Sequence, residues 1–148
     1  MRALTLAVVL LCGCTQASRP SSVTDEAFEA MSTWQRELLT ARSLEMEWGA
    51  TGKSGYERLG NSKSLSGAEA NALKDFFAKP LGQRQTLCLV HIDAAVRAGS
   101  RLVELCFGCG AVIVDHEEWH SVDKTAMKAF FTAQLGARPP EPNYFEGY

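Results

Sequence analysis

Apolar residues recur at two different spacings along the chain, and each spacing predicts a different element. A spacing of three to four residues predicts a helix near 25–41, a second helix after Ser66 and a last helix that ends at Gly136. Apolar and acidic residues alternate from Leu44 to Trp48, which predicts a half-buried strand with one face in water. The apolar helix positions are Ala27, Met31, Trp34 and Leu38 in the first, Leu73, Phe76 and Phe77 in the second, and Met127, Phe130, Phe131 and Leu135 in the last.

Capping residues mark where these helices begin and end. Thr24 is a suitable N-cap for the first helix, which has two acidic residues in its first turn. Ser66 and Glu69 have the spacing of a capping box for the second helix. The Arg-Pro-Pro stretch that follows soon after Gly136 cannot continue the last helix, which we therefore expect to stop at this glycine.

Further strands are expected between the helices. The GATGKSG segment is a turn, and Tyr56–Leu59 is expected to return beside the first strand. Residues 86–96 and 101–114 are rich in Val, Leu and Ile, and the turn at 98–100 makes them a hairpin. This order of elements predicts an α+β domain, with an antiparallel sheet of about four to five strands and about three helices packed on one face.

The first twenty residues, MRALTLAVVLLCGCTQASRP, have the pattern of an export signal. Arg2 supplies a positive start, and Ala3–Leu11 is apolar but much shorter than the ~20 residues of a membrane span. Small residues then precede Cys14. We therefore expect residues 1–13 to be a signal peptide. The alternatives are a secretory signal cut elsewhere or the first helix of a cytosolic protein.

Leu11–Cys14 resembles the lipobox of bacterial lipoproteins. The resemblance implies that Cys14 is acylated and becomes the mature N-terminus, whereas Cys12 leaves with the signal. Two or three acyl chains would anchor the protein stably in a membrane, since each buried CH₂ contributes ~0.8 kcal/mol. By resemblance to envelope sorting, Thr15 in place of Asp favours the outer membrane. The expected location is thus the bacterial cell envelope, with the membrane as a partner through the lipid.

The remaining chain divides into a tether, one domain and a tail. Residues 14–22 are small, polar and interrupted by proline, as in a flexible lipidated tether. Residues 23–138 suffice for a single α+β domain, and 139–148 form a C-terminal tail. Removing the signal takes Arg2 with it and brings the formal charge from −2 to near −3. With no basic stripe, a nucleic-acid partner is not expected.

Three cysteines remain in the domain: Cys88, Cys106 and Cys109. An exported protein meets oxidising conditions, so a disulfide is the default expectation. If the hairpin turns tightly at 98–99, paired residue numbers sum to 197, which places Cys88 opposite Cys109 and His91 opposite Cys106. The alternatives are buried thiols, a structural zinc site formed by these three cysteines and His91, or redox chemistry at the Cys-x-x-Cys pair.

The segment ELCFGC, followed by KTAMKAFFTAQLG, resembles a group of uncharacterised bacterial envelope proteins. The resemblance covers roughly residues 86–136 and is carried by a strand that ends in Cys-Phe-x-Cys and by a closing helix. It implies a shared small fold and no known activity. It also implies that Cys88, Cys106 and Cys109 belong together.

The stretch His116–His120 reads His-Glu-Glu-Trp-His and matches the metal-binding helix of zinc peptidases. On a helix, His116 and His120 would hold zinc and Glu117 would activate the bound water. The match is partial, because a charged residue precedes the second histidine and Asp123, about 10 Å along the helix from His116, cannot easily share the ion. The alternative interpretation is an exposed polar connection between the last strand and the last helix.

Two hypotheses of different classes follow from these patterns. The preferred one is a lipid-anchored envelope protein with a binding or structural domain, no catalytic residue and no cofactor, whose partner is an envelope protein or ligand. The alternative is a small zinc-dependent hydrolase or peptidase that uses His116, Glu117 and His120.

Overall fold

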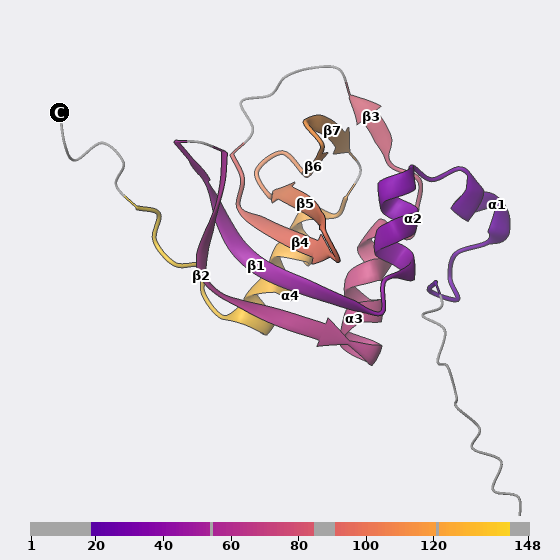
Figure 1. Cartoon of the computed structure of the whole chain (residues 1–148), viewed down its shortest axis with the longest axis horizontal. Helices are drawn as coiled ribbons and strands as arrows, with labels where there is room; N and C mark the ends of the chain where they lie inside the picture. Colours follow the sequence, from indigo (N-terminus) through magenta and orange to yellow (C-terminus); the bar gives the residue numbers. More distant parts are fainter. Residues whose placement is uncertain (1–18, 54, 85–90, 121, 143–148) are drawn as a thin grey trace, which may run out of the picture.

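The computed structural model describes residues 19–53, 55–84, 91–120 and 122–142 (Figure 1). Its α-helices are α1 (Asp25–Glu29), α2 (Thr33–Thr40), α3 (Gly67–Lys74) and α4 (Lys124–Leu135), and a short 3₁₀ helix, η1 (Asp75–Phe77), follows α3. The strands are β1 (Ser43–Gly52), β2 (Gly55–Ser66), β3 (Gly82–Arg84), β4 (Ala94–Ala98), β5 (Arg101–Cys106), β6 (Ala111–Val114) and β7 (Glu117–His120).

All the strands join one antiparallel sheet, in the order β2-β1-β4-β5-β6-β7-β3. The predicted α+β class, with an antiparallel sheet and packed helices, is confirmed. The sheet has seven strands, more than the four to five expected. The additional strands arise because residues 101–114 fold into two strands rather than one and because 117–120 and 82–84 also pair.

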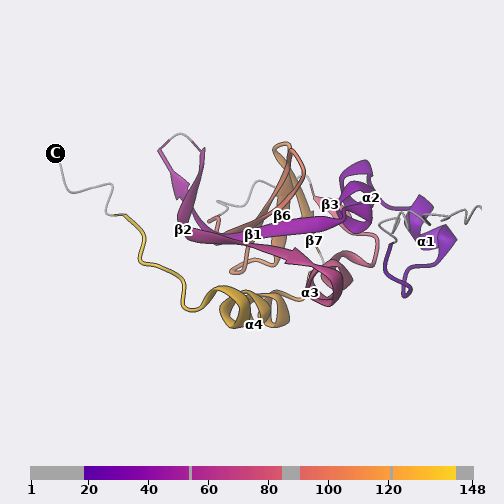
Figure 2. The ribbon, with the colours of Figure 1, turned by 60° about the horizontal axis from the view of Figure 1, so that its bottom comes forward.

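One row of paired residues crosses six strands and forms the centre of the core. It runs Leu59, Trp48, Ala94, Leu105, Val112 and Trp119, each paired with the next on the neighbouring strand. Figure 2 shows α3 and α4 together on one side of the sheet. At the β7 end of this row, Trp34 of α2 contacts Trp119, with ring centroids 5.8 Å apart. The helices therefore cover the face that this row defines.

Aromatic side chains hold α4 against the sheet. Phe131 is fully buried, and its ring centroid lies 5.6 Å from those of both Trp48 and Phe107. Beyond α4, the Trp48 indole donates a hydrogen bond to Gly136 O at 3.2 Å, and Arg138 donates to Asp93 O at 3.2 Å. The chain is thus fastened to the sheet before the expected C-terminal tail begins.

The single helix expected near 25–41 is two helices. Ser32 accepts a hydrogen bond from the Gln35 N–H at 3.4 Å and so caps a new helix, while Thr24 caps the first by accepting from the Ala27 N–H at 3.2 Å. Part of the expected tether packs on the domain, since Pro20 is buried and its carbonyl accepts a hydrogen bond from the Val23 N–H at 3.0 Å.

The return strand extends well beyond Tyr56–Leu59. Strand β2 continues to Ser66. The strand contains a bulge. Glu47 pairs with Ser62 whereas Trp48 pairs with Leu59, so the two residues of β2 between Leu59 and Ser62 have no paired residue on β1. Ser66 is the N-cap residue of α3 as expected, although its side chain makes no capping hydrogen bond.

Truncating Phe131 to Ala should destabilise the fold by about 3–5 kcal/mol, because the change leaves a cavity between α4 and the sheet. Chemical unfolding of the mature protein would measure the effect. Lys128→Ala, an exposed change on the same helix, is the matched control and should stay within about 0.5 kcal/mol of the wild type. Equal losses in both variants would contradict this account of the core.

Candidate functional site

The face of the sheet opposite α3 and α4 carries a second row of paired residues with polar chemistry. It runs Ser62, Glu47, Ala95, Glu104, Ile113 and Glu118, directly beside the core row. Because side chains alternate between the two faces of a strand, burying the core row sends this one to the other side. Two carboxylates, Glu47 and Glu104, thus come to lie on this open face, and charged residues of neighbouring rows surround them.

Glu47 is fully buried although it lies on the open face. Its Oε1 accepts a hydrogen bond from the Tyr56 hydroxyl at 2.8 Å and is 3.1 Å from Nη2 of Arg97. Its Oε2 accepts no hydrogen bond from any described residue and is 3.9 Å from Nη1 of Arg58. The first strand was expected to have a fully wet face, and at Glu47 that expectation is wrong.

The Tyr56 ring covers Glu47 because the sequence leaves room for it. A Cβ at Gly49 would lie 2.3 Å from Cε2 of Tyr56, so only glycine fits there. Burial, and then the hydrogen bond to Glu47, raises the pKa of Tyr56 far above its ordinary value. The phenol therefore remains protonated and donates to the carboxylate.

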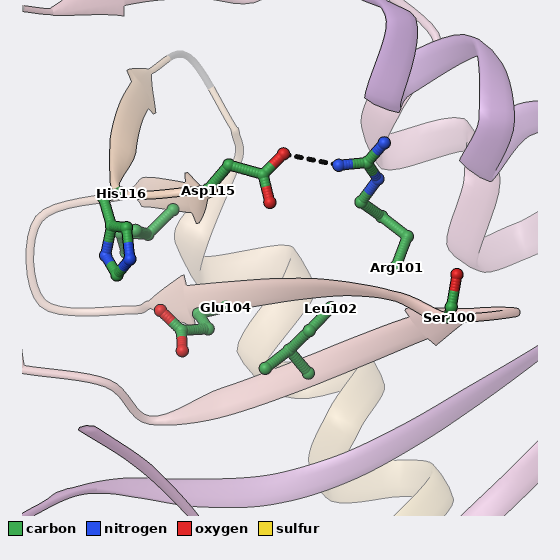
Figure 3. A pocket seen from close by; sticks show the side chains of 7 residues that line it. Ser100, Arg101, Leu102, Glu104, Asp115 and His116 are labelled. Atoms are coloured by element: carbon green, nitrogen blue, oxygen red, sulfur yellow. Dashed lines mark hydrogen bonds and ion pairs between the residues drawn. The ribbon is translucent and has the colours of Figure 1, made fainter. Parts of the chain in front are cut away.

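Next to this network is a pocket of about 410 Å³ (Figure 3). At its rim Arg101 forms two ion pairs, one with Glu37 of α2, where Nε lies 2.9 Å from Oε2, and one with Asp115. The pocket is lined by Ser100, Arg101, Leu102, Glu104, Ile113, Asp115 and His116. The β4–β5 turn, the middle of β5 and the β6–β7 turn thus converge on it.

Glu104 is the chemically distinctive group of this pocket. Its side chain is half-buried, and no ion-pair partner lies within 4 Å among the residues that the structure describes. Burial raises the pKa of the Glu104 carboxyl above its usual range, and the nearby His116 lowers it in part. In Figure 3 the carboxylate and the imidazole both point into the space between the strands. Such a carboxylate is suited to receive a hydrogen-bond donor or a cation from a ligand.

The His-Glu-Glu-Trp-His stretch is not the helix that the peptidase hypothesis requires, and that expectation is wrong. Asp115, His116 and Glu117 are exposed, as the alternative interpretation expected, but they belong to a hairpin and not to an irregular connection. Asp115 and His116 have φ of 53° and 68° and form the two-residue turn of the β6–β7 hairpin, and Glu117–His120 is strand β7. Positive φ at both positions defines a type I′ turn, which Asp tolerates better than most residues. A strand advances ~3.3 Å per residue. His116, in the turn before β7, and His120, the last residue of β7, are therefore too far apart to act as one helical ligand pair.

The cysteine arrangement also differs from the prediction. Pairs between β4 and β5 sum to 199 rather than 197, and β5 ends at Cys106, so Cys109 lies in the turn that follows β5 and not in the ladder between β4 and β5. His91 does not face Cys106. It is exposed, and its Nε2 lies 2.7 Å from Oε1 of Glu141. Both Cys88 and the predicted lipidation site Cys14 lie outside the described residues.

Within the described parts of the chain, no three His, Cys, Asp or Glu side chains are grouped so that they could hold a metal ion. These parts also contain no helix long and apolar enough to cross a membrane. In the comparisons with known proteins, no family model, no curated protein and no solved structure matches the chain. The fold and the open face therefore define the class of protein, an α+β domain with one polar sheet face.

Replacing Glu104 with Gln tests the electrostatics of the pocket. A carboxyl whose pKa is raised on folding contributes stability below its ordinary pKa, near 4.3, and loses it as the pH rises through the raised value. Glu104→Gln should therefore raise the stability and the Tm at neutral pH, and the difference should vanish in acid, where the carboxyl is protonated in the folded and the unfolded state.

Thermal unfolding across a pH series measures this difference. His116→Gln serves as the control for titration of the neighbouring imidazole, and Glu26→Gln, an exposed change on α1, should give no gain. A Glu104→Gln variant that is less stable than the wild type at neutral pH would contradict this account, because it would show that the ionised carboxylate has favourable partners within the fold.

Proposed function

We propose that the protein is a lipid-anchored cell-envelope protein whose α+β domain binds a ligand on the open face of its sheet. The observation that supports binding is the half-buried Glu104 carboxylate in the pocket, which has no ion-pair partner within the described chain. Folding desolvates this group and gains no ion pair there in return, which is the pattern expected of a residue retained for a ligand.

The charges around the pocket favour a ligand with a compact positive group. Arg101 is shared between Glu37 and Asp115, so its charge is already more than balanced. Glu104 then adds a further negative charge inside the pocket. A guanidinium or primary amine would satisfy the Glu104 carboxylate through charge-assisted hydrogen bonds. The volume of about 410 Å³ suits a small molecule or a single side chain of a partner.

The anchor part of the proposal is supported by the sequence of Leu11–Cys14 and by the polar residues that follow it. Acyl chains on Cys14 would hold the domain near a membrane, because only a few residues separate Cys14 from the first described residues, Arg19 and Pro20. His116 and His120 do not form the helical ligand pair of the zinc-hydrolase hypothesis, because His116 lies in the turn before β7 and His120 at the far end of that strand.

Ligand binding can be tested with two nearly isosteric probes, arginine amide and citrulline amide, which differ in the charge of the terminal group. The detergent-solubilised full chain should bind arginine amide and discriminate against citrulline amide. Glu104→Gln should weaken binding of the charged probe at least ~10-fold, because a hydrogen bond to a charged group is worth ~1.5–3 kcal/mol. Calorimetric titration measures both affinities.

Glu26→Gln is the matched control and should leave the affinity unchanged, since that carboxylate is exposed on α1 and far along the chain from the pocket. Equal affinity for the two probes, or binding of arginine amide that is indifferent to Glu104→Gln, would rule out the pocket as a cation site.

Lipidation can be tested by Cys14→Ser in a bacterial host that processes lipoproteins. The wild-type chain should partition into the detergent phase and have the mass of an acylated protein that begins at Cys14. The Cys14→Ser chain should lose the acyl mass and the detergent partition. Cys12→Ser is the matched control and should be acylated normally, since residue 12 is removed with the signal. Detergent partition that survives Cys14→Ser would contradict the proposed anchor.

A further inference from the structure

The Cys-x-x-Cys pair lies in the turn that joins β5 to β6. Cys106 is the last residue of β5, and its carbonyl accepts a hydrogen bond from the Gly110 N–H at 3.0 Å. Cys109 donates its N–H to Sγ of Cys106 at 3.4 Å, and the two sulfur atoms are 2.7 Å apart. A turn brings residues i and i+3 within about 7 Å, which is the range that a disulfide spans. The turn alone therefore brings the two thiols together.

Contacts from two other segments, one before β4 and one at the start of α4, hold this turn in place. Asp93, just before β4, accepts a hydrogen bond from the Phe107 N–H at 2.7 Å. Lys124, at the start of α4, donates from Nζ to Gly108 O at 2.9 Å. Gly110 has φ of 67°, and a Cβ there would meet the carbonyl of Val122 at 3.4 Å. The sulfur atoms are thus positioned by the fold and need no large movement to react.

We infer that Cys106 and Cys109 form a reversible disulfide within this turn, by exchange with an external disulfide such as a protein disulfide oxidant or oxidised glutathione. The two thiols differ in access: Cys106 is 5% exposed, whereas Cys109 is half-buried and reachable from solvent. Cys109 is the attacking thiol and Cys106 the resolving one. Lys124 Nζ, which donates to Gly108 O, adds a positive charge to the same turn.

The exchange proceeds in two displacements. The Cys109 thiolate attacks one sulfur of the external disulfide, forms a mixed disulfide and expels the first external thiolate. The Cys106 thiolate then attacks Sγ of Cys109, forms the Cys106–Cys109 bond and expels the second external thiolate. The protein loses two electrons and two protons, and the external disulfide takes them up as two thiols. A dithiol in the surroundings reverses the reaction, because Cys109 remains accessible.

This site is independent of the proposed ligand pocket, and it changes the expected pairing of the cysteines. The hairpin predicted from the sequence placed Cys88 opposite Cys109. The turn instead brings Cys106 and Cys109 together. Cys88 is then the unpaired thiol of the oxidised protein.

Proteolytic mapping distinguishes these pairings. Full-length protein is extracted without reductant, its thiols are blocked with N-ethylmaleimide, and it is then unfolded and digested with trypsin. Cleavage places Cys106 and Cys109 together in the peptide Leu102–Lys124 and Cys88 alone in Gln85–Arg97. We expect Leu102–Lys124 to be unlabelled and lighter by two hydrogens, and Gln85–Arg97 to carry one maleimide. Linkage of the two peptides, or two maleimides on Leu102–Lys124, would overturn the inference.

Reversibility is tested in a Cys88→Ser background, which retains only this thiol pair in the domain. Incubation of the folded protein in glutathione buffers of graded ratio should convert Leu102–Lys124 between the two states through one reproducible midpoint. Cys106→Ser should instead trap a mixed disulfide with glutathione on Cys109, whereas Cys109→Ser should react much more slowly because Cys106 is buried. A pair that stays oxidised until the protein unfolds, or equal labelling of the two single variants, would contradict the proposed exchange site.

Discussion

The burial of one row of side chains across the sheet is the constraint on which the rest of the structure depends. Leu59, Trp48, Ala94, Leu105, Val112 and Trp119 pair in succession across six strands and pack under the helices. Apolar burial stabilises by roughly 25 cal/mol per Å², and a slip of one residue in any strand would exchange its two faces. The same packing therefore sets the register and sends Glu47 and Glu104 to the opposite face.

The open face is polar in a way that an additional helix could not cover. Glu47 is held by Tyr56 and Arg97 and is buried beneath the Tyr56 ring. Removing one partner of such a group leaves an uncompensated charge, which costs several kcal/mol, so the network rigidifies the sheet beside the pocket. Glu104 lies two strands away on the same row and has no such network. Glu47 is ion-paired with arginine, whereas Glu104 has no ion-pair partner among the described residues. This contrast separates the structural part of the face from the part suited to a ligand.

Much of the fold could be predicted from the sequence, because local periodicity reports which face is buried. The alternation of Leu44, Met46 and Trp48, the turn at Gly99 and the last helix all appear where the pattern indicated. The burial of Glu47 could not be predicted, because it results from a Tyr56 ring that lies across Gly49 on the neighbouring strand. Such cross-strand contacts depend on register, which local pattern alone leaves open.

The candidate sites were harder to predict for the same reason. The i, i+4 spacing of His116 and His120 is compatible with a helix, yet Val112 and Trp119 pair across a hairpin that turns at Asp115 and His116. The sequence did contain a signal for this hairpin. Apolar residues alternate at Val112 and Val114 and continue, across the turn, at Trp119. The Cys-x-x-Cys pair was placed on a continuous strand, whereas the backbone turns after Cys106 and needs glycine at 110. The pocket residues Arg101 and Glu104 had no motif to identify them, because they come together only through the sheet.

The bulge in β2 shows how this sheet can change length without losing its faces. The two unpaired residues between Leu59 and Ser62 are Gly60 and Asn61, and Leu65 and Leu59 point to the helices on either side of them. Two is an even number, so the inside and outside positions stay in phase across the irregularity. Over evolutionary time this edge strand can therefore gain or lose residues in pairs and keep both its core and its polar surface. A single insertion would instead move the buried side chains on one side of it to the polar face.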